Sequence, residues 1–322
     1  MQNNSAPGGL KFSISNHIKR LAKSSPAVRR EFYPSDAEYK CTVNSYDDPL
    51  IEDEHQVIKG MVYKYTGRVL ILLTMSCAAY CRFCTRRRRV SEITGGLVTR
   101  SDISKMEQFL LAHGEINELI FSGGDPLTAP DLLIYSLKKL SKLTQIKIIR
   151  IHTRIPVSNP KLLNLPAGRH GFKLLNLIKL IKQPVYVSVH FEHPDELTPE
   201  TIVAVNKLRK AGAILLSQSV FLKGVNDDYK ILFELFTKLS EFGIRPYYIY
   251  RCDPVKGIEH FIVDFEKEIE IMTKLRATLS GIACPTYVID SPNGAGKIPV
   301  PLNFWSFNPK SFRDYNNKEI IV

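Results

Sequence analysis

Residues 68–84 read RVLILLTMSCAAYCRFC, an apolar run that leads straight into three closely spaced cysteines. The run is short and rich in branched side chains, which is typical of a strand buried on both faces of a parallel sheet. Cys77, Cys81 and Cys84 follow it directly. Because functional groups gather at the carboxyl ends of parallel strands, this loop is the first candidate site in the chain.

The cysteine spacing favours a metal centre over a disulfide scaffold. The chain has 322 residues and six cysteines, and its first twenty residues lack the apolar core of a secretory signal. Zinc usually takes four ligands in two C-x2-C pairs, and the second pair is missing. An iron–sulfur cube held by three thiolates leaves one iron open to a non-protein ligand. We therefore expect such a cluster here, and we expect Cys41, Cys252 and Cys284 to be inert core residues.

Strand, loop and helix patterns recur after the cysteines. Further strands are expected over residues 118–122, 147–152, 185–190, 214–220 and 246–251. Helices are expected over residues 101–112, 131–142, 160–182, 198–211, 227–242 and 263–279. Six β/α units in series build either a doubly wound sheet or a barrel, closed or incomplete, and periodicity alone does not choose between them.

We expect three regions along the chain. Residues 1–66 form a lead-in layer with short helices and few residue types suited to catalysis. Residues 67–283 hold the repeating units, and residues 284–322 form a final loop and tail.

The charge balance is strongly basic. The chain carries 44 lysines and arginines against 32 aspartates and glutamates, a net charge of +12. Such a balance favours anionic partners of any size, and Arg86–Arg89 contribute a local run. No apolar run approaches the roughly 20 residues that span a bilayer. We therefore expect a cytoplasmic protein without a membrane partner.

Two other strand ends carry polar groups. The second strand runs into Gly123, Gly124 and Asp125; glycines let a backbone approach a ligand closely, although an isolated G-G-D is more often an ordinary turn. The fifth strand carries Gln218 between two serines. Polar groups in an apolar strand either satisfy one another in the core or line a pocket, and the sequence leaves both open.

The last part of the chain adds two aspartates and one lysine. Asp253 ends the sixth strand, and CPTYVIDSPNGAGKIPV, residues 284–300, contains Asp290 and Lys297. The loop is not a phosphate-binding P-loop, because Ile298 stands where that motif has a hydroxyl residue. A lysine in a G-x-G-K loop is commonly a solvated turn, but a lysine on a close-packed loop also suits pyridoxal phosphate (PLP) chemistry.

The cysteine spacing C-x3-C-x2-C is the signature of the radical S-adenosylmethionine (SAM) enzymes, and the wider pattern resembles the lysine 2,3-aminomutase family. The resemblance runs from about residue 62 to residue 300. It includes YKYTGRVL (63–70), HTRIP (152–156), HFEHP (190–194) and the loop around Lys297. It implies an α/β fold, a partial (β/α)6 TIM-like barrel of the radical SAM type, with a helical lead-in and a short C-terminal segment that carries the PLP lysine.

The resemblance also implies a role for each candidate residue. Cys77, Cys81 and Cys84 would hold a [4Fe-4S] cluster, and Lys297 would hold PLP through an imine bond. The remaining implied roles are SAM binding by Phe83, Gly123, Gly124, Asp125 and Gln218, PLP binding by Tyr65 and Arg68, binding of the substrate carboxylate by Arg86, and binding of the ε-ammonium by Asp253 and Asp290.

These roles imply an isomerase that interconverts L-lysine and β-lysine by 1,2-amino migration. The alternatives are a 2,3-aminomutase of glutamate or arginine, an elongation-factor-P-associated lysine mutase, or a radical SAM enzyme that modifies tRNA or protein. A flavodoxin or ferredoxin is the expected reductant, a homo-oligomer is possible, and no nucleic-acid partner is expected. Zinc is not expected, because no cysteine follows Cys284 and Asp228 stands at a position that resembles one zinc ligand of the family.

Overall fold

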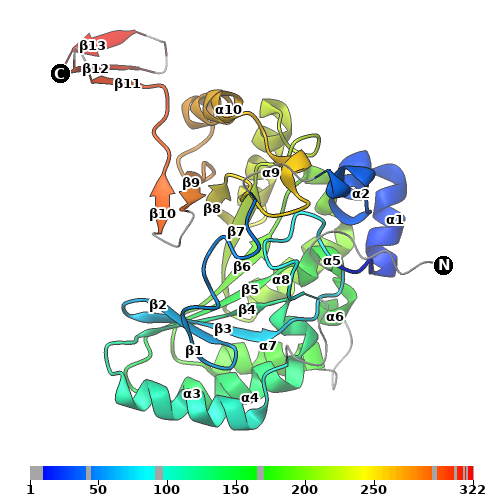
Figure 1. The fold of residues 1–322 in the computed structure, drawn as a ribbon, viewed down its shortest axis with the longest axis vertical. Coiled ribbons are helices and arrows are strands. Elements are labelled where there is room, and N and C mark those ends of the chain that lie inside the picture. The colour runs from blue at the N-terminus through cyan, green and yellow to red at the C-terminus, as the bar shows by residue number, and fades with distance from the viewer. Residues whose placement is uncertain are drawn as a thin grey trace.

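A ten-stranded sheet forms the centre of the computed structural model, which describes residues 10–40, 45–90, 97–164, 170–291, 296–307, 310–314, 316 and 318–321 (Figure 1). Its strands are β1 (Gln56–Ile58), β2 (Met61–Tyr65), β3 (Arg68–Thr74), β4 (Glu118–Gly123), β5 (Ile148–Thr153), β6 (Val185–His190), β7 (Ile214–Val220), β8 (Arg245–Tyr250), β9 (Thr286–Asp290) and β10 (Lys297–Pro299). Strand order follows the chain from β1 to β10. The sheet is not closed, since no pairing joins its two edge strands within the described ranges.

Seven strands, β3 to β9, run parallel, while β1, β2 and β10 pair antiparallel at the two edges. The helices are α1 (Asn16–Ser24), α2 (Pro26–Phe32), α3 (Arg100–Ala112), α4 (Pro130–Leu140), α5 (Ile155–Ser158), α6 (Lys161–Asn164), α7 (His170–Leu180), α8 (Pro199–Lys210), α9 (Tyr229–Glu241) and α10 (Phe265–Thr278). Short 3₁₀ turns lie at Asp36–Tyr39, Pro126–Thr128, Pro194–Glu196 and Glu259–Phe261. The long helices between parallel strands are the crossovers that parallel pairing requires.

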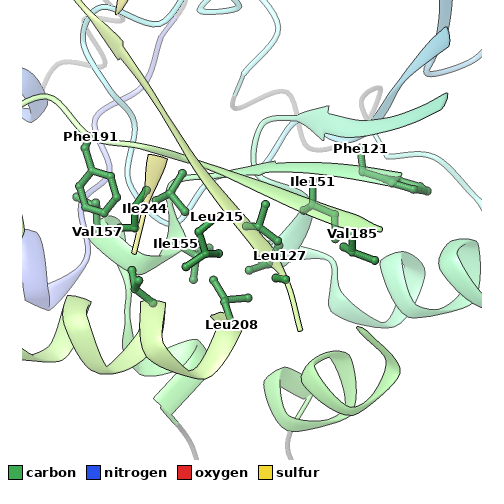
Figure 2. Close-up of a cluster of buried hydrophobic side chains, with 14 of the residues drawn as sticks. Phe121, Leu127, Ile151, Ile155, Val157, Val185, Phe191, Leu208, Leu215 and Ile244 are labelled. Carbon is green, nitrogen blue, oxygen red and sulfur yellow. The ribbon is translucent and has the colours of Figure 1, made fainter. Parts of the chain in front are cut away.

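The two faces of the parallel strands differ in polarity. Figure 2 shows Phe121, Ile151 and Val185 packed with helix residues such as Leu208 on the outer face. Along β5 the alternate residues Arg150 and His152 line the opposite face, which is hollow. Side chains of successive strand residues point to opposite faces, so one face builds the core and the other lines a cavity.

The six strands expected from the sequence are all present, and the fold is the expected α/β, incomplete barrel. The expected helix over residues 160–182 is realised as α6 and α7, with residues 165–169 outside the described part. The sequence did not reveal the hairpin β1–β2, the seventh parallel strand β9 or its partner β10. Because the sheet runs from β1 to β10, it crosses residues 66 and 284, and the three-region division remains a prediction.

The lead-in is helical as expected, with α1 and α2 capped by the side chains of Ser15 and Ser25. After β10, a separate three-stranded sheet is formed by β11 (Trp305–Phe307), β12 (Lys310–Arg313) and β13 (Glu319–Ile321) (Figure 1). No helix in the described ranges is long and apolar enough to span a membrane.

Candidate active site

One cavity of about 560 Å³ opens on the hollow face of the sheet. Every candidate site residue named from the sequence lines it. These are Tyr65, Arg68, Cys77, Cys81, Phe83, Cys84, Arg86, Gly123, Gly124, Asp125, Gln218, Asp253, Asp290 and Lys297. The structure therefore brings the three thiols and the lysine together from segments more than 200 residues apart, whereas their individual roles remain proposals.

The cysteine loop follows β3 in the chain and packs against the lead-in. Its backbone is anchored by hydrogen bonds from Tyr80 N to Ser13 O (3.0 Å) and from Arg82 N to Glu31 O (2.7 Å). The guanidinium of Arg82 is buried on the carboxylate of Glu38 with a 2.6 Å ion pair. These contacts fix a long loop that has no helix or strand of its own, so the thiols are held in place before any ligand binds.

The three thiols suit a cluster better than a single metal ion. Burial raises the pKa of Cys77, Cys81 and Cys84, and for Cys77 the neighbouring Asp125 and the other two thiols raise it further. No three described His, Cys, Asp or Glu side chains converge on a point as one metal ion requires. In an iron–sulfur cube each thiolate binds a different iron, which fits thiols that share a wall without meeting at one point.

Glycine is required at positions 123 and 124, because the turn that they form packs closely against the chain that leads to the cysteines. A Cβ atom on Gly123 would lie 2.3 Å from Thr74 O, and one on Gly124 would lie 2.4 Å from Ser76 O. Gly123 also has a φ of +117°, which side-chain-bearing residues rarely adopt. The glycines therefore let the turn pack against the chain between β3 and the first cysteine.

Asp125 is bound by the protein itself. Its carboxylate accepts hydrogen bonds from Thr153 Oγ1 (2.9 Å), Arg154 N (2.7 Å) and Leu127 N (3.0 Å). Burial raises the pKa of Asp125 to about 6, although these hydrogen bonds oppose the shift. The carboxylate thus joins the end of β4 to the end of β5 at the cavity wall.

The polar residues of β7 divide between the two faces. Gln218 lines the cavity and donates to the hydroxyl of Tyr250 (3.0 Å), whereas Ser219 donates to Phe191 O (2.6 Å) on the core side. Beside Gln218 in the sheet lies His190, on whose ring the ring of Phe83 stacks with centroids 6.2 Å apart. Burial lowers the pKa of His190 to about 3, so this ring is neutral at physiological pH.

Lys297 and the two aspartates meet at the β8–β10 edge. Residues Lys297 and Asp290 are paired across the β9–β10 hairpin, and their side chains form an ion pair. Burial, followed by repulsion from Asp290, raises the pKa of Asp253 to about 7. The Oδ1 atom of Asp290 is buried and finds no hydrogen-bond partner among the described residues. This edge therefore has spare capacity for a cation.

Arg86 lies at the other side of the cavity and is held by Glu52. Its Nε and Nη2 atoms donate to the Glu52 carboxylate at 2.8 and 2.6 Å, and its Nη1 atom donates to Gly123 O at 3.5 Å. One N–H on each of Nη1 and Nη2 remains for a second acid. Burial lowers the pKa of Arg86, but Glu52 raises it more strongly and the net shift is upward. Glu52 belongs to the lead-in, where the sequence showed no motif.

Other cavity residues were not predicted from the sequence. Lys64 of β2 approaches the Asp290–Lys297 pair closely enough that both affect its pKa, which burial lowers overall. The guanidinium of Arg68 packs over the Tyr65 ring, 4.4 Å from its centroid. Lys64, Arg150, His152, Arg154 and Tyr250 also line the cavity. Because side chains alternate between the two faces of a strand, the sequence divides each strand into two sets of residues. It does not show which of the two sets lines the cavity.

Comparisons with known proteins place the chain in a family. The model of the radical SAM superfamily matches residues 71–236. L-lysine 2,3-aminomutase of Clostridium subterminale is 38% identical over 86% of this chain and 65% of that protein. L-lysine 2,3-aminomutase of Methanococcus maripaludis is 37% identical over 92% of this chain and 67% of that protein. The chain belongs to the lysine 2,3-aminomutase family.

Members of this family need not share one substrate. Glutamate 2,3-aminomutase of Clostridioides difficile is 34% identical over 79% of this chain and 58% of that protein. A solved radical SAM methyltransferase from Sphaerobacter thermophilus matches 71% of this chain and 68% of that chain at 18% identity, with a TM-score of 0.48. This aminomutase-family chain spans about two thirds of the length of the two lysine enzymes.

Membership of the lysine 2,3-aminomutase family implies three cofactors: a [4Fe-4S] cluster, SAM and PLP. The donor set fits them, because three half-buried thiols and one lysine amine line the same cavity. The position that resembles a zinc ligand, Asp228, instead caps α9 by accepting from Lys230 N (2.8 Å).

Proposed function

We propose that this chain is an isomerase that converts L-lysine to β-lysine by moving the amino group from C2 to C3. The observation that supports the proposal is the charge layout of the cavity. Arg86 offers the remaining N–H groups of its guanidinium at one side, and Asp253 and Asp290 lie together at the other. L-lysine carries a carboxylate at one end and an ammonium at the other, so its charges match this layout.

The proposed residue roles follow from this layout. Cys77, Cys81 and Cys84 would hold the cluster, and Lys297 would hold PLP covalently. When bound, the cluster and SAM would supply radical chemistry at C3 of the substrate, and PLP would make nitrogen migration accessible. The protein orients the substrate between the two charged ends and limits access of water to the radical.

The SAM and PLP contacts are proposed for the remaining candidates. Phe83, Gly123, Gly124, Asp125 and Gln218 line the cavity and would bind SAM. Tyr65 and Arg68 would bind PLP together with Lys297. Three hydrogen bonds from the protein already orient the Asp125 carboxylate for its proposed role.

Glutamate is disfavoured by electrostatics. Its side-chain carboxylate would lie beside Asp253 and Asp290, and like charges in a poorly solvated pocket repel. A one-electron donor such as flavodoxin or ferredoxin, and a cytoplasmic location, complete the proposal.

A substrate screen tests the function. Anaerobically reconstituted protein with dithionite, SAM and PLP is expected to convert L-lysine to β-lysine and to leave glutamate and arginine unchanged. The variant Asp290→Asn is expected to raise the KM for lysine roughly 30-fold, corresponding to about 2 kcal/mol for a buried charge pair, with little change in SAM binding. Equal turnover of glutamate would refute the charge argument.

Loss of the covalent PLP link gives an independent check. Lys297→Ala is expected to abolish the visible absorbance of bound PLP while the iron content stays at the parental level. Borohydride reduction followed by peptide mapping locates the link. Trapping on a different lysine would show that the assignment of Lys297 is wrong.

A further inference from the structure

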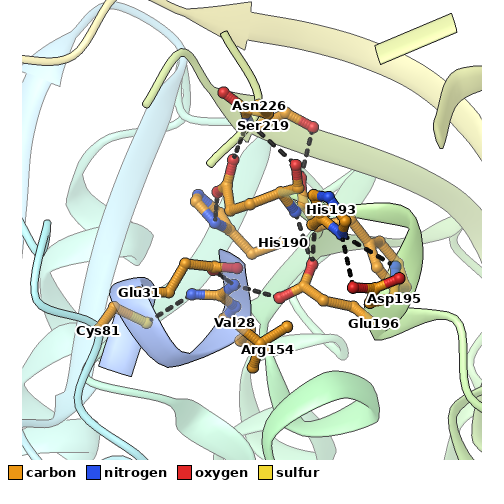
Figure 3. A network of polar contacts seen from close by, with 12 residues as sticks. Val28, Glu31, Cys81, Arg154, His190, His193, Asp195, Glu196, Ser219 and Asn226 are labelled. Carbon is orange, nitrogen blue, oxygen red and sulfur yellow. Dashed lines mark hydrogen bonds and ion pairs between the residues drawn. The ribbon is translucent and has the colours of Figure 1, made fainter. Parts of the chain in front are cut away.

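Arg154 makes a contact to the cysteine loop that the proposed amino migration does not use. It follows β5 and is almost fully buried. Its Nη1 atom donates to Cys81 Sγ at 2.8 Å (Figure 3), and its guanidinium lies 5.2 Å from the centroid of the Phe83 ring. One cation of the cavity wall therefore lies against a proposed cluster ligand.

Two carboxylates hold the same guanidinium from behind. Nη2 of Arg154 forms ion pairs with Glu31 of α2 and with Glu196, and both acids are fully buried. A third buried acid, Glu192, lies close by, with its Oε1 atom 2.7 Å from Nδ1 of the neutral His190. The charge felt by the Cys81 sulfur is thus set by one arginine and by acids from two segments, α2 and the residues that follow β6.

Burying this arginine and its acids costs desolvation free energy, so we look for a functional effect of these charges on the Cys81 sulfur. Buried charges lose their hydration, and hydrophobic residues of similar volume often replace such groups without loss of stability. Arg154 also takes no part in the two charged ends of the cavity that match lysine. Hydrogen bonds and charges next to the sulfurs are among the features that set the reduction potential of an iron–sulfur cluster.

We propose that Arg154 is a positioning residue that tunes the cluster: its hydrogen bond to Cys81 raises the reduction potential, and Glu31 and Glu196 moderate this effect. Reduction adds one electron, donated by the external reductant, to a centre already surrounded by thiolates. A cation in contact with a sulfur stabilises that electron in a medium of low dielectric constant. Carboxylates paired with the cation oppose it. The inference rests on the cluster that the proposed function requires but not on lysine as the substrate.

The charge model predicts shifts of opposite sign. Arg154→Gln is expected to lower the reduction potential, and Glu31→Gln is expected to raise it. Arg154→Lys keeps the charge and is expected to stay nearer the parental potential than Arg154→Gln. A purely structural role predicts loss of iron in each variant but no such reversal of sign.

An electron paramagnetic resonance redox titration with dithionite, performed on the reconstituted protein without amino acid, measures the potential. Arg251→Gln is the control for the loss of an arginine charge, because Arg251 lies after β8, far along the chain from the cysteine loop, and its guanidinium pairs with the buried Glu268. Its potential is expected to match that of the parent. An equal shift in Arg251→Gln would overturn the proposal.

The experiment remains decisive if one variant does not hold a cluster. Should Arg154→Gln lose its iron, Glu31→Gln decides, and an unchanged or lowered potential overturns the proposal. Because no lysine is present, a failure of lysine turnover leaves this measurement unaffected. Conversely, a chain that converts lysine but shows equal potentials in all variants would keep the proposed function and refute the role of Arg154.

Discussion

The guanidinium of Arg86 is the most specific single-residue feature of the cavity. Glu52 accepts from Nε and Nη2, and Gly123 O accepts from Nη1 (3.5 Å), so one N–H on each of Nη1 and Nη2 is left for a substrate carboxylate. Arg86→Lys removes this planar fork but keeps the charge. We expect the KM for lysine to rise at least about ten-fold, corresponding to about 1.5 kcal/mol for a charged hydrogen bond, while SAM binding is unchanged.

Arg88→Lys is the control for that change. Arg88 belongs to the same basic run, but it pairs with Asp48 and Asp53 outside the cavity. Steady-state kinetics of the two variants separate a general effect of changing an arginine in residues 86–89 from a specific effect of losing the planar guanidinium of Arg86. Equal losses would contradict the assignment of the carboxylate site.

The raised pKa of Asp253 predicts a pH dependence of substrate binding. With a pKa of about 7, this acid gains a proton as the pH falls through neutrality and can no longer attract an ammonium group. Lysine itself remains charged over that range, so the change belongs to the protein. We expect the KM for lysine to rise below about pH 7 and to level off above it.

Asp253→Asn supplies the reference for this profile. It removes the titrating group, so its KM is expected to be high and nearly independent of pH between 6 and 8. Binding is measured by initial rates at saturating SAM. A variant that retains the parental pH profile would assign the transition to a different group.

At the level of elements, the turn after β4 depends on close backbone contact with the cysteine loop. Gly124 N donates to Thr74 O (2.6 Å), and an added Cβ would lie 2.4 Å from Ser76 O. Gly124→Ala is therefore expected to destabilise the protein by about 1–3 kcal/mol, as overpacking does. Gly114→Ala is the control, because nothing lies within 4 Å of the position of its Cβ.

Urea unfolding of the cofactor-free protein and the iron content after reconstitution measure this effect. We expect the Gly124 variant to bind less iron, because the turn supports the chain that precedes Cys77. Equal stability of the two alanine variants would show that the loop adjusts without cost.

The repeated elements were predictable from sequence because burial imposes a pattern on them. Strands β3 to β8 are apolar runs followed by loops and amphipathic helices, so their periodicity reveals them. The edge strands β1 and β10 have three residues each and are largely exposed, and β10 ends in Pro299. Such strands carry little pattern, and only their pairing with β2 and β9 makes them visible.

The candidate site was predictable to the extent that it lies in local motifs. The three cysteines stand out because their spacing is unusual, whereas Gly123–Gly124 and Lys297 were identified by their place in the chain and by the family resemblance. The partners Glu31 and Glu52 lie in the lead-in, which looked poor in catalytic residue types. Their proximity to Arg154 and Arg86 follows from tertiary packing over more than 30 residues, and no local pattern encodes it.

At the scale of the whole molecule, the open sheet places candidate PLP ligands on both of its ends. Tyr65 and Arg68 belong to β2 and β3, whereas Lys297 belongs to β10, and all three line one cavity. A cofactor held by both groups would tie the two ends together across the gap that hydrogen bonds leave open. Binding energy then stabilises the native chain by mass action, by about 2.7 kcal/mol at a ligand concentration one hundred times Kd.

Hydrogen–deuterium exchange tests whether PLP joins the two ends. Added PLP is expected to slow amide exchange both in β2–β3 and in β9–β10 and to raise the unfolding temperature. Arg68→Ala is expected to weaken protection of β10 although the two residues lie at opposite ends of the sheet order. Protection confined to β9–β10, in the parent and in the variant alike, would mean that Lys297 alone holds the cofactor. The cavity would then owe its shape to the hydrogen-bonded strands and not to a ligand that bridges the open edges.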